Sequence, residues 1–262
     1  MIHRTLPLLL ALGACKAPEA PDTIEEMMVY GFENFEAEDP AYMVALAEKL
    51  IPWMDNHMAE AEEGYAVNAL GDANLAAAGV DATVEEEILG AVTGVDFVAP
   101  PEDLAAVYVY PHQDEIFDTY IEFTRETDDD PDCFAEQRCE FFRASDDVHI
   151  DMGVLGIEMF NGYDTAFRWI ELSDGTKAIA HRNLGPLPIE FTVNFLAVYQ
   201  QYSFSFSYAR PDGTTRRAWT IWADGEVIGA DLPESWQISQ GVSAMHNAAE
   251  NINAWLRGET GA

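Results

Sequence analysis

Apolar residues in the first third of the chain recur every three to four positions, the spacing that places them on one face of an α-helix. A first helix is expected to begin after Thr23, because Thr23 and Glu26 have the spacing of a capping box. A second is expected from Asp39 and Pro40, an N-cap residue followed by proline at the first helical position, to about residue 64. Pro52 lies inside this stretch and predicts a kink or a restart. The positions predicted to face inward are Met43, Leu46, Leu50, Trp53, Met54, His57, Met58 and Ala61.

The segment that follows is harder to assign from its pattern. Residues 65–82 are rich in alanine and glycine, and Thr83 and Glu86 then repeat the capping-box spacing. Two adjacent prolines, Pro100 and Pro101, break the chain again. These features predict that residues 23–110 are mainly helical.

From about residue 115 the hydrophobic period changes from 3.6 to 2, which is typical of β-strands with one buried face. Phe117, Ile121 and Phe123 alternate with polar residues, and Val148 and Ile150 do the same. Dipeptides that favour tight hairpin turns occur at Asn161-Gly162, Asp174-Gly175, Asp212-Gly213 and Asp224-Gly225. The pattern predicts an antiparallel meander of roughly six to eight strands over residues 115–235.

The last segment, residues 239–257, has the pattern of a closing helix. Its predicted inner face consists of Val242, Met245, Ala249, Ile252 and Leu256. No linker separates these parts, so we expect one α+β domain over residues 23–262, with N-terminal helices, a curved antiparallel sheet and a last helix packed on it.

The charge of the chain narrows the classes of partner. The formal net charge is −34, and residues 17–160 hold 36 acidic side chains and 4 basic ones. A field of this sign repels nucleic acid and anionic lipid surfaces, so neither is expected as a partner. It attracts basic partners and divalent cations, which favours weak cation binding. Solubility or adaptation to a salty medium explains the same charge without a specific partner.

The N-terminus combines a short apolar run with a single cysteine. Residues 6–13 are apolar, follow Arg4, and are too short for a stable membrane span. Small residues precede Cys15, and the polar, proline-rich residues 16–22 have the composition of an extended tether. The sequence Leu12-Gly13-Ala14-Cys15 resembles the lipobox of bacterial lipoproteins, and the resemblance covers residues 1–15.

The resemblance implies a signal peptide over residues 1–14 and a mature N-terminus at Cys15 that carries lipid, with acyl chains such as palmitate. It implies a protein anchored by lipid in the bacterial cell envelope. In that family an aspartate after the cysteine often marks retention at the inner membrane; Lys16 stands there, which favours the outer membrane. Ordinary secretion, with cleavage after Gly13, is the alternative.

Once Cys15 is assigned to the anchor, Cys133 and Cys139 are left as a pair. Five intervening residues are enough to bring the two Cα atoms within disulfide distance, and an exported protein reaches an oxidising compartment. The spacing matches neither a C-x-x-C redox motif nor a zinc knuckle. We therefore predict a structural disulfide between them.

Residues 202–208 form the clearest strand of the sequence. Its aromatic residues point one way and its serines the other, and a second aromatic segment follows across a predicted turn. The aromatic face could line a cavity for an apolar ligand, or it could be core beneath a helix. The candidate ligand-lining residues are Tyr202, Phe204, Phe206, Tyr208 and Trp219.

Motifs of catalysis and of metal binding are not found. The acidic residues 128–132 lack the spacing and the glycine of an EF-hand loop, and His246 with Glu250 lacks a third zinc ligand. His149 and Asp151 share one face of a predicted strand and could form an acid–base pair or a surface ladder. No catalytic residue, metal ligand or cofactor is assigned.

These observations leave three functions open, of which the first is the one that we expect and the other two are alternatives. The first is a binding or assembly module in the envelope, held by its lipid and without chemistry of its own. The second is a carrier of a lipophilic ligand, because lipoproteins that carry such molecules often use a half-barrel sheet closed by helices, an arrangement similar in outline. The third is an envelope hydrolase whose catalytic residues are scattered in sequence.

Overall fold

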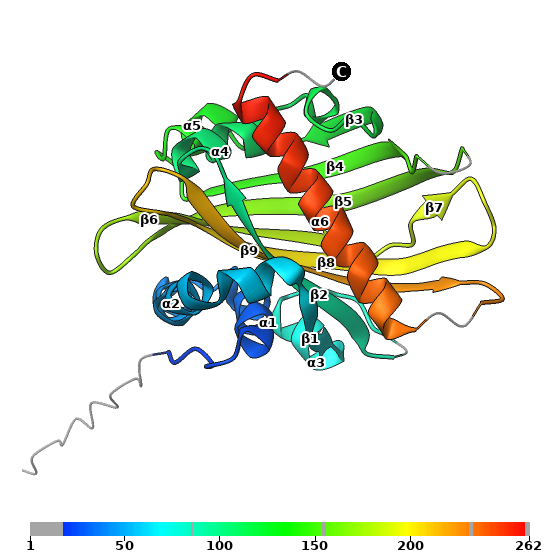
Figure 1. The fold of residues 1–262 in the computed structure, drawn as a ribbon, viewed down its shortest axis with the longest axis horizontal. Helices are drawn as coiled ribbons and strands as arrows, with labels where there is room; N and C mark the ends of the chain where they lie inside the picture. The colour runs from blue at the N-terminus through cyan, green and yellow to red at the C-terminus, as the bar shows by residue number, and fades with distance from the viewer. Residues whose placement is uncertain (1–17, 85, 154–155, 231–232, 260–262) are drawn as a thin grey trace, which may run out of the picture.

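The computed structural model describes residues 18–84, 86–153, 156–230 and 233–259, and has helices on both faces of one large antiparallel sheet (Figure 1). The expected signal peptide and Cys15 lie outside the described residues. Within the described ranges, no helix is both long and apolar enough to cross a bilayer. The expected α+β class, with N-terminal helices and a closing C-terminal helix, is confirmed.

The helices in chain order are α1 (Ile24–Asn34), α2 (Ala41–Glu63), α3 (Asp72–Ala77), α4 (Pro101–Val109), a 3-10 turn η1 (Gln113–Glu115), α5 (Pro131–Ala135) and α6 (Glu234–Leu256). The strands are β1 (Tyr65–Leu70), β2 (Ile88–Phe97), β3 (Tyr120–Glu126), β4 (Phe141–Asp151), β5 (Glu158–Glu171), β6 (Lys177–Gly185), β7 (Glu190–Phe191), β8 (Leu196–Ala209) and β9 (Thr215–Val227). Their order across the nine-stranded sheet is β1-β2-β9-β8-β6-β5-β4-β3, and β7 pairs with β5.

α1 begins directly after its predicted cap, Thr23, whereas α2 begins at Ala41, one residue later than predicted, with Pro40 in the N-cap position. Thr23 Oγ1 accepts a hydrogen bond from the Glu26 amide, and Asp39 Oδ1 accepts one from the Ala41 amide. α2 continues through Pro52, and its backbone departs from helical angles at His57 instead. There the His57 imidazole lies 2.8 Å from the Trp53 carbonyl oxygen, so a side chain takes an acceptor that the helix backbone would use.

The prediction that residues 23–110 are mainly helical is wrong for two segments, β1 and β2. Thr83 caps no helix; the Val84 amide beside it donates to Asp72, and strand β2 begins soon after. β2 is buried on both faces, so its residues lack the alternation that marks a half-exposed strand. Its glycines also lower its resemblance to a strand in the sequence. Gly90 is needed for packing, because a Cβ built there would lie 2.3 Å from the Trp222 ring.

The rest of the sheet follows the predicted meander from β3 to β9, with two of the four predicted turns in place. Asp174-Gly175 and Asp212-Gly213 connect hairpins, and both glycines have positive φ, 81° and 83°. Asn161-Gly162 and Asp224-Gly225 instead lie inside strands β5 and β9. Both dipeptides are paired across the sheet, and these cross-strand hydrogen bonds outweigh the local turn preference. Strands β1 and β2, at one end of the sheet, bring the described total to nine.

One face of the sheet is covered by α1 and α2, and we call it the α1 face (Figure 1). Here Phe32 of α1 packs against the rings of Tyr202 and Trp222, at centroid distances of 5.9 and 5.4 Å. Gly31 allows this close approach, since a Cβ there would lie 2.2 Å from the Phe204 ring. The opposite face carries α4 and α6, and we call it the α6 face.

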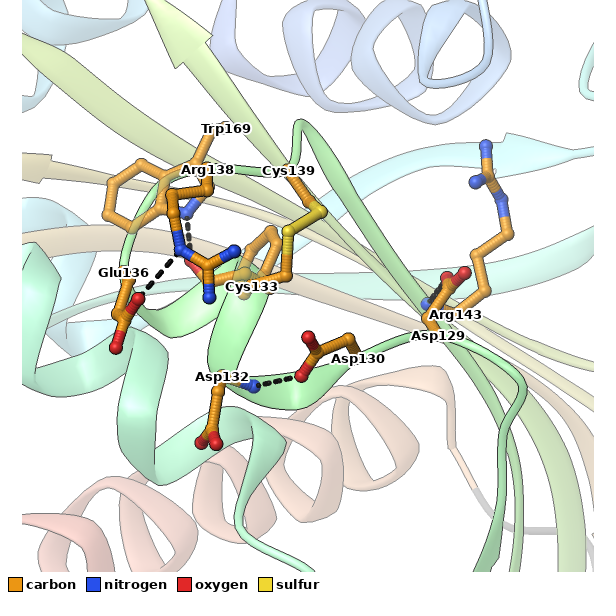
Figure 2. Close-up of a disulfide and its surroundings, with 10 residues drawn as sticks. Asp129, Asp130, Asp132, Cys133, Glu136, Arg138, Cys139, Arg143 and Trp169 are labelled. Atoms are coloured by element: carbon orange, nitrogen blue, oxygen red, sulfur yellow. Dashed lines mark hydrogen bonds and ion pairs between the residues drawn. A yellow bond between two sulfur atoms is a disulfide. The ribbon is translucent and has the colours of Figure 1, made fainter.

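Cys133 and Cys139 form a disulfide beside the acidic loop before β4 (Figure 2). Their Cα atoms are 5.3 Å apart. The acidic run has local structural roles: Asp130 caps α5 by accepting from the Asp132 amide, and Asp129 accepts from the backbone of Arg143. The small bridged loop therefore closes a connection in which several carboxylates lie close together.

We predict that replacing both cysteines, in the double variant Cys133→Ala and Cys139→Ala, lowers the free energy of unfolding by about 2 kcal/mol, because a loop this short restricts the unfolded chain by about that amount. Urea denaturation of the two proteins measures the difference. Thiol titration of denatured, unreduced protein carrying Cys15→Ser should detect no free thiol. Two free thiols would contradict the disulfide.

Candidate functional site

A cavity of about 650 Å³ lies between the α6 face of the sheet and helix α6. Figure 1 shows α6 crossing the sheet diagonally over the central strands. The helix is held on β2 by polar side chains: Asn253 accepts from the Val98 amide and donates to the Asp96 carbonyl, and His246 lies 3.1 Å from Thr93 Oγ1. Since β2 lies towards one edge of the sheet, the other side of α6 faces the cavity.

The wall of the cavity has an apolar part and a polar part. The apolar part comes from β3, β4, β5 and α6, and consists mainly of Phe123, Val148, Ile150, Met152, Met159, Ala244, Ala248 and Ile252. The polar part comes from the central strands β5, β6, β8 and β9, and includes Thr165, His181, Asn183, Ser203 and Arg217. A ligand that fits both parts has an apolar body and a polar end.

Strand alternation decides which residues of β8 reach this site. The serines of the strand lie on the α6 face, where Ser203 lines the cavity. The aromatic residues point to the α1 face and belong to its hydrophobic core. Of the five candidate ligand-lining residues, Trp219 lies in the cavity wall. Tyr202 borders the cavity, but its ring packs on Phe32 in the core of the α1 face. The remaining three, Phe204, Phe206 and Tyr208, do not line the cavity. For these three the structure shows the alternative interpretation, core beneath a helix.

His181 is at the centre of the polar part and is fully enclosed by side chains. Its ring stacks on Phe167 at 4.4 Å between centroids. The Arg217 guanidinium lies 2.9 Å from Nδ1, and Asn183 Oδ1 lies 2.7 Å from Nε2. An arginine can only donate, so Nδ1 accepts and the ring proton is on Nε2, which donates to Asn183. Burial, together with the nearby Arg217, lowers the pKa of His181 well below its usual value.

A second polar group of the wall is a buried ion pair. Arg125 and Asp146 form two hydrogen bonds of 2.7 Å each, and both side chains are almost fully buried. Arg125 also donates to the Tyr108 carbonyl at 2.8 Å. Burial raises the pKa of Asp146, while Arg125 opposes this shift. This pair closes one side of the cavity with its charges balanced.

The other candidate residues of the sequence lie apart from this cavity or at its edge. His149 pairs with Glu158, at 2.9 Å, and not with Asp151; its ring also stacks on Phe160. The Asp151 carboxylate instead accepts a hydrogen bond from the Gly153 amide. Within the described ranges, no group of three or more histidine, cysteine or acidic residues is placed to hold a metal ion. The chemistry that the cavity offers is hydrogen bonding and charge, with the apolar wall beside it.

No family model matches this sequence, and no curated protein matches it. Solved structures show a distant likeness. A START superfamily protein from Mycobacterium smegmatis aligns with a TM-score of 0.42 and 5% identity, over 65% of this chain and 99% of that one. The lipid transfer and protein localization domain of human StarD13 gives 0.41 and 12%, over 78% and 95%. A STAR-related lipid transfer protein fragment from Xanthomonas axonopodis gives 0.45 and 11%, over 65% and 86%.

The neutral state of His181 predicts a stability that depends on pH. Its pKa is depressed in the folded protein, whereas the unfolded chain takes up a proton as the pH falls through about 6.5. The stability linked to this group is therefore present above that pH and is lost below it. Glutamine does not titrate, so His181→Gln lacks this pH dependence. The free energy of unfolding of the wild type minus that of His181→Gln should therefore fall by about 1.4 kcal/mol from pH 7.5 to pH 5.5.

Urea denaturation at the two pH values measures this difference. His112→Gln, at an exposed position, is the matched control, and it corrects for the titration of the many carboxylates. An advantage of His181 over glutamine that is the same at both pH values would contradict a neutral buried imidazole.

Proposed function

We propose that this protein binds a small lipophilic molecule in the cavity beneath α6 and acts as its carrier. The observation that carries the proposal is the cavity itself: about 650 Å³ enclosed by a curved sheet and one helix. Binding sites for small molecules commonly have this size, with a mostly apolar wall and a few polar groups.

The packing around the cavity supports this role. Protein interiors are close-packed, and empty apolar space of this size costs stability. The side of α6 that faces the cavity carries small and short side chains, among them Ala244, Asn247 and Ala248, which leave the space open. On its other side, α6 buries Met245 and Ala249. The helix therefore has one packed side and one side that leaves room for a ligand.

We further propose that the carrier is anchored in the bacterial envelope by lipid on Cys15, with the outer membrane favoured over the inner. The support is the lipobox resemblance of residues 12–15 and the tether-like composition of residues 16–22. An anchor of two or three acyl chains makes release from the membrane negligible. The protein would then bind its ligand beside the membrane that holds it.

A bulky substitution that fills the cavity tests whether a ligand binds there. In the full chain carrying Cys15→Ser, which removes the lipid of the protein itself, the neutral fluorescent probe N-phenylnaphthylamine should bind with increased emission. Ala248→Trp places a large ring in the cavity and should weaken binding by at least about tenfold, because the probe loses the space that it occupies. Ser243→Trp, at an exposed position of the same helix, is the matched control and should leave binding unchanged.

Native mass spectrometry of the same protein gives an independent readout. A co-purifying small molecule that is lost in Ala248→Trp supports a carrier. Equal probe binding by wild type, Ala248→Trp and Ser243→Trp would show that the probe binds outside the cavity and would refute the proposal.

The anchor is tested separately by detergent phase partitioning. The wild-type protein should enter the detergent phase, and Cys15→Ser should move to the aqueous phase. An unacylated mature N-terminus at Ala14, found by mass spectrometry of wild-type protein, would contradict the anchor and would indicate ordinary secretion.

A further inference from the structure

Arg217 is a buried cation in the cavity wall that forms no ion pair with any described carboxylate. Its side chain is 2% exposed. Within the described residues, its hydrogen bonds go to neutral groups, His181 Nδ1 at 2.9 Å and the Tyr108 hydroxyl at 3.4 Å. Its guanidinium lies over the Trp219 ring, 3.9 Å from the centroid. A buried charge is costly unless it is paired, and neutral partners compensate it only in part.

The other buried arginines of the described chain show what is missing at Arg217. Arg168 pairs with Glu140, Arg182 with Glu36, and Arg216 with both Asp96 and Asp55. The other arginine of the cavity wall, Arg125, is neutralised by Asp146. The chain has 47 acidic residues, so a buried arginine that pairs with none of those described is an exception.

Two neighbours of Arg217 in the wall also have unsatisfied polar atoms. The Arg217 Nε, the Trp219 Nε1 and the Ser203 Oγ are buried and have no hydrogen-bond partner among the described residues. All three can donate a hydrogen bond. The three side chains belong to the adjacent strands β8 and β9 and line the same cavity. Buried donors without acceptors are rare in folded proteins, and a group of them beside a cation indicates a place for an acceptor.

The acidic residues that line the cavity do not occupy this place. Asp118, Asp151 and Glu250 are exposed at its rim, and Asp146 is held by Arg125. The cavity thus has negative charge at its rim and, inside, an arginine that no carboxylate of the described residues neutralises, next to the neutral imidazole of His181.

We infer that the ligand is an amphipathic anion whose carboxylate or phosphate head group binds Arg217, with Trp219 and Ser203 as further donors. The inference rests on the proposed function and names the class of molecule carried. The head group neutralises the guanidinium and supplies an acceptor to Nε, which has no hydrogen-bond partner among the described residues. The apolar tail then lies along the wall formed by β3, β4, β5 and α6. His181 is a positioning residue, because its Nδ1 holds the guanidinium in place.

Competition between matched ligands tests the inference. N-phenylnaphthylamine is bound to the full chain carrying Cys15→Ser and is displaced by dodecanoate, by dodecyl phosphate or by dodecanol, which have the same alkyl chain. Wild-type protein should bind at least one of the two anions about tenfold or more tightly than the alcohol, because charge-assisted hydrogen bonds in a buried site discriminate by at least that factor. The better anion identifies the head group.

In Arg217→Met this preference for the anion should disappear while the neutral probe still binds. Arg210→Met removes one positive charge from a more exposed ion pair outside the cavity and should keep the preference. Trp219→Phe removes one donor and keeps the ring, and should reduce the preference about threefold or more. This milder variant tests the site if Arg217→Met fails to fold.

Each outcome separates the inference from the proposed function. Failure of the neutral probe to bind wild-type protein would refute the cavity as a ligand site, and with it the inference. Binding of the probe with equal affinity for anions and alcohol would overturn the anion site and leave the carrier proposal standing. The anion preference could persist at full strength in Trp219→Phe and, if that variant folds, in Arg217→Met. This result would show that the anion binds elsewhere and would also overturn the inference.

Discussion

Burial of both faces of the sheet is the constraint on which the rest of the structure depends. Because side chains alternate along a strand, each central strand must supply two different surfaces at once. In β8 the aromatic residues form core with α1 and α2, and the serines face α6. The same backbone therefore builds a packed hydrophobic layer on one face and a polar wall on the other, and the cavity exists because α6 leaves the polar wall uncovered.

Because one face of the sheet forms the hydrophobic core, the other face can carry polar binding groups without loss of the domain's stability. The α1 face contains a continuous cluster of buried apolar residues, which contributes the burial that a domain of this size needs. On the α6 face the central strands do not have to supply hydrophobic core, so buried polar groups are tolerated there. His181 is satisfied on both ring nitrogens, and Arg125 is satisfied by Asp146. Among the described residues, no carboxylate neutralises the charge of Arg217.

The carrier proposal and the anion site use different parts of this arrangement. Enclosed volume and an apolar wall determine whether a lipophilic molecule fits, whereas a buried cation with unsatisfied donors determines which end of it points inward. The strongly acidic surface has a consequence here. The outer field of the protein repels an amphipathic anion, so its binding depends on the local positive charge inside the cavity, where water screens less.

Features that depend on neighbours in sequence were predictable from the chain alone. Thr23 caps α1 as predicted, Asp174-Gly175 and Asp212-Gly213 form turns, and residues 202–208 alternate as expected. Each of these features depends on backbone hydrogen bonds or side-chain direction within a few residues. The tertiary structure decided what depends on distant neighbours. Because β2 is buried on both faces, its sequence has no alternating hydrophobic pattern. Only the packed sheet shows that the aromatic face of β8 is core. Whether an arginine lies beside a carboxylate depends on distances between strands. The sequence therefore could not show that Arg217 pairs with no carboxylate in the part of the chain that the structure describes.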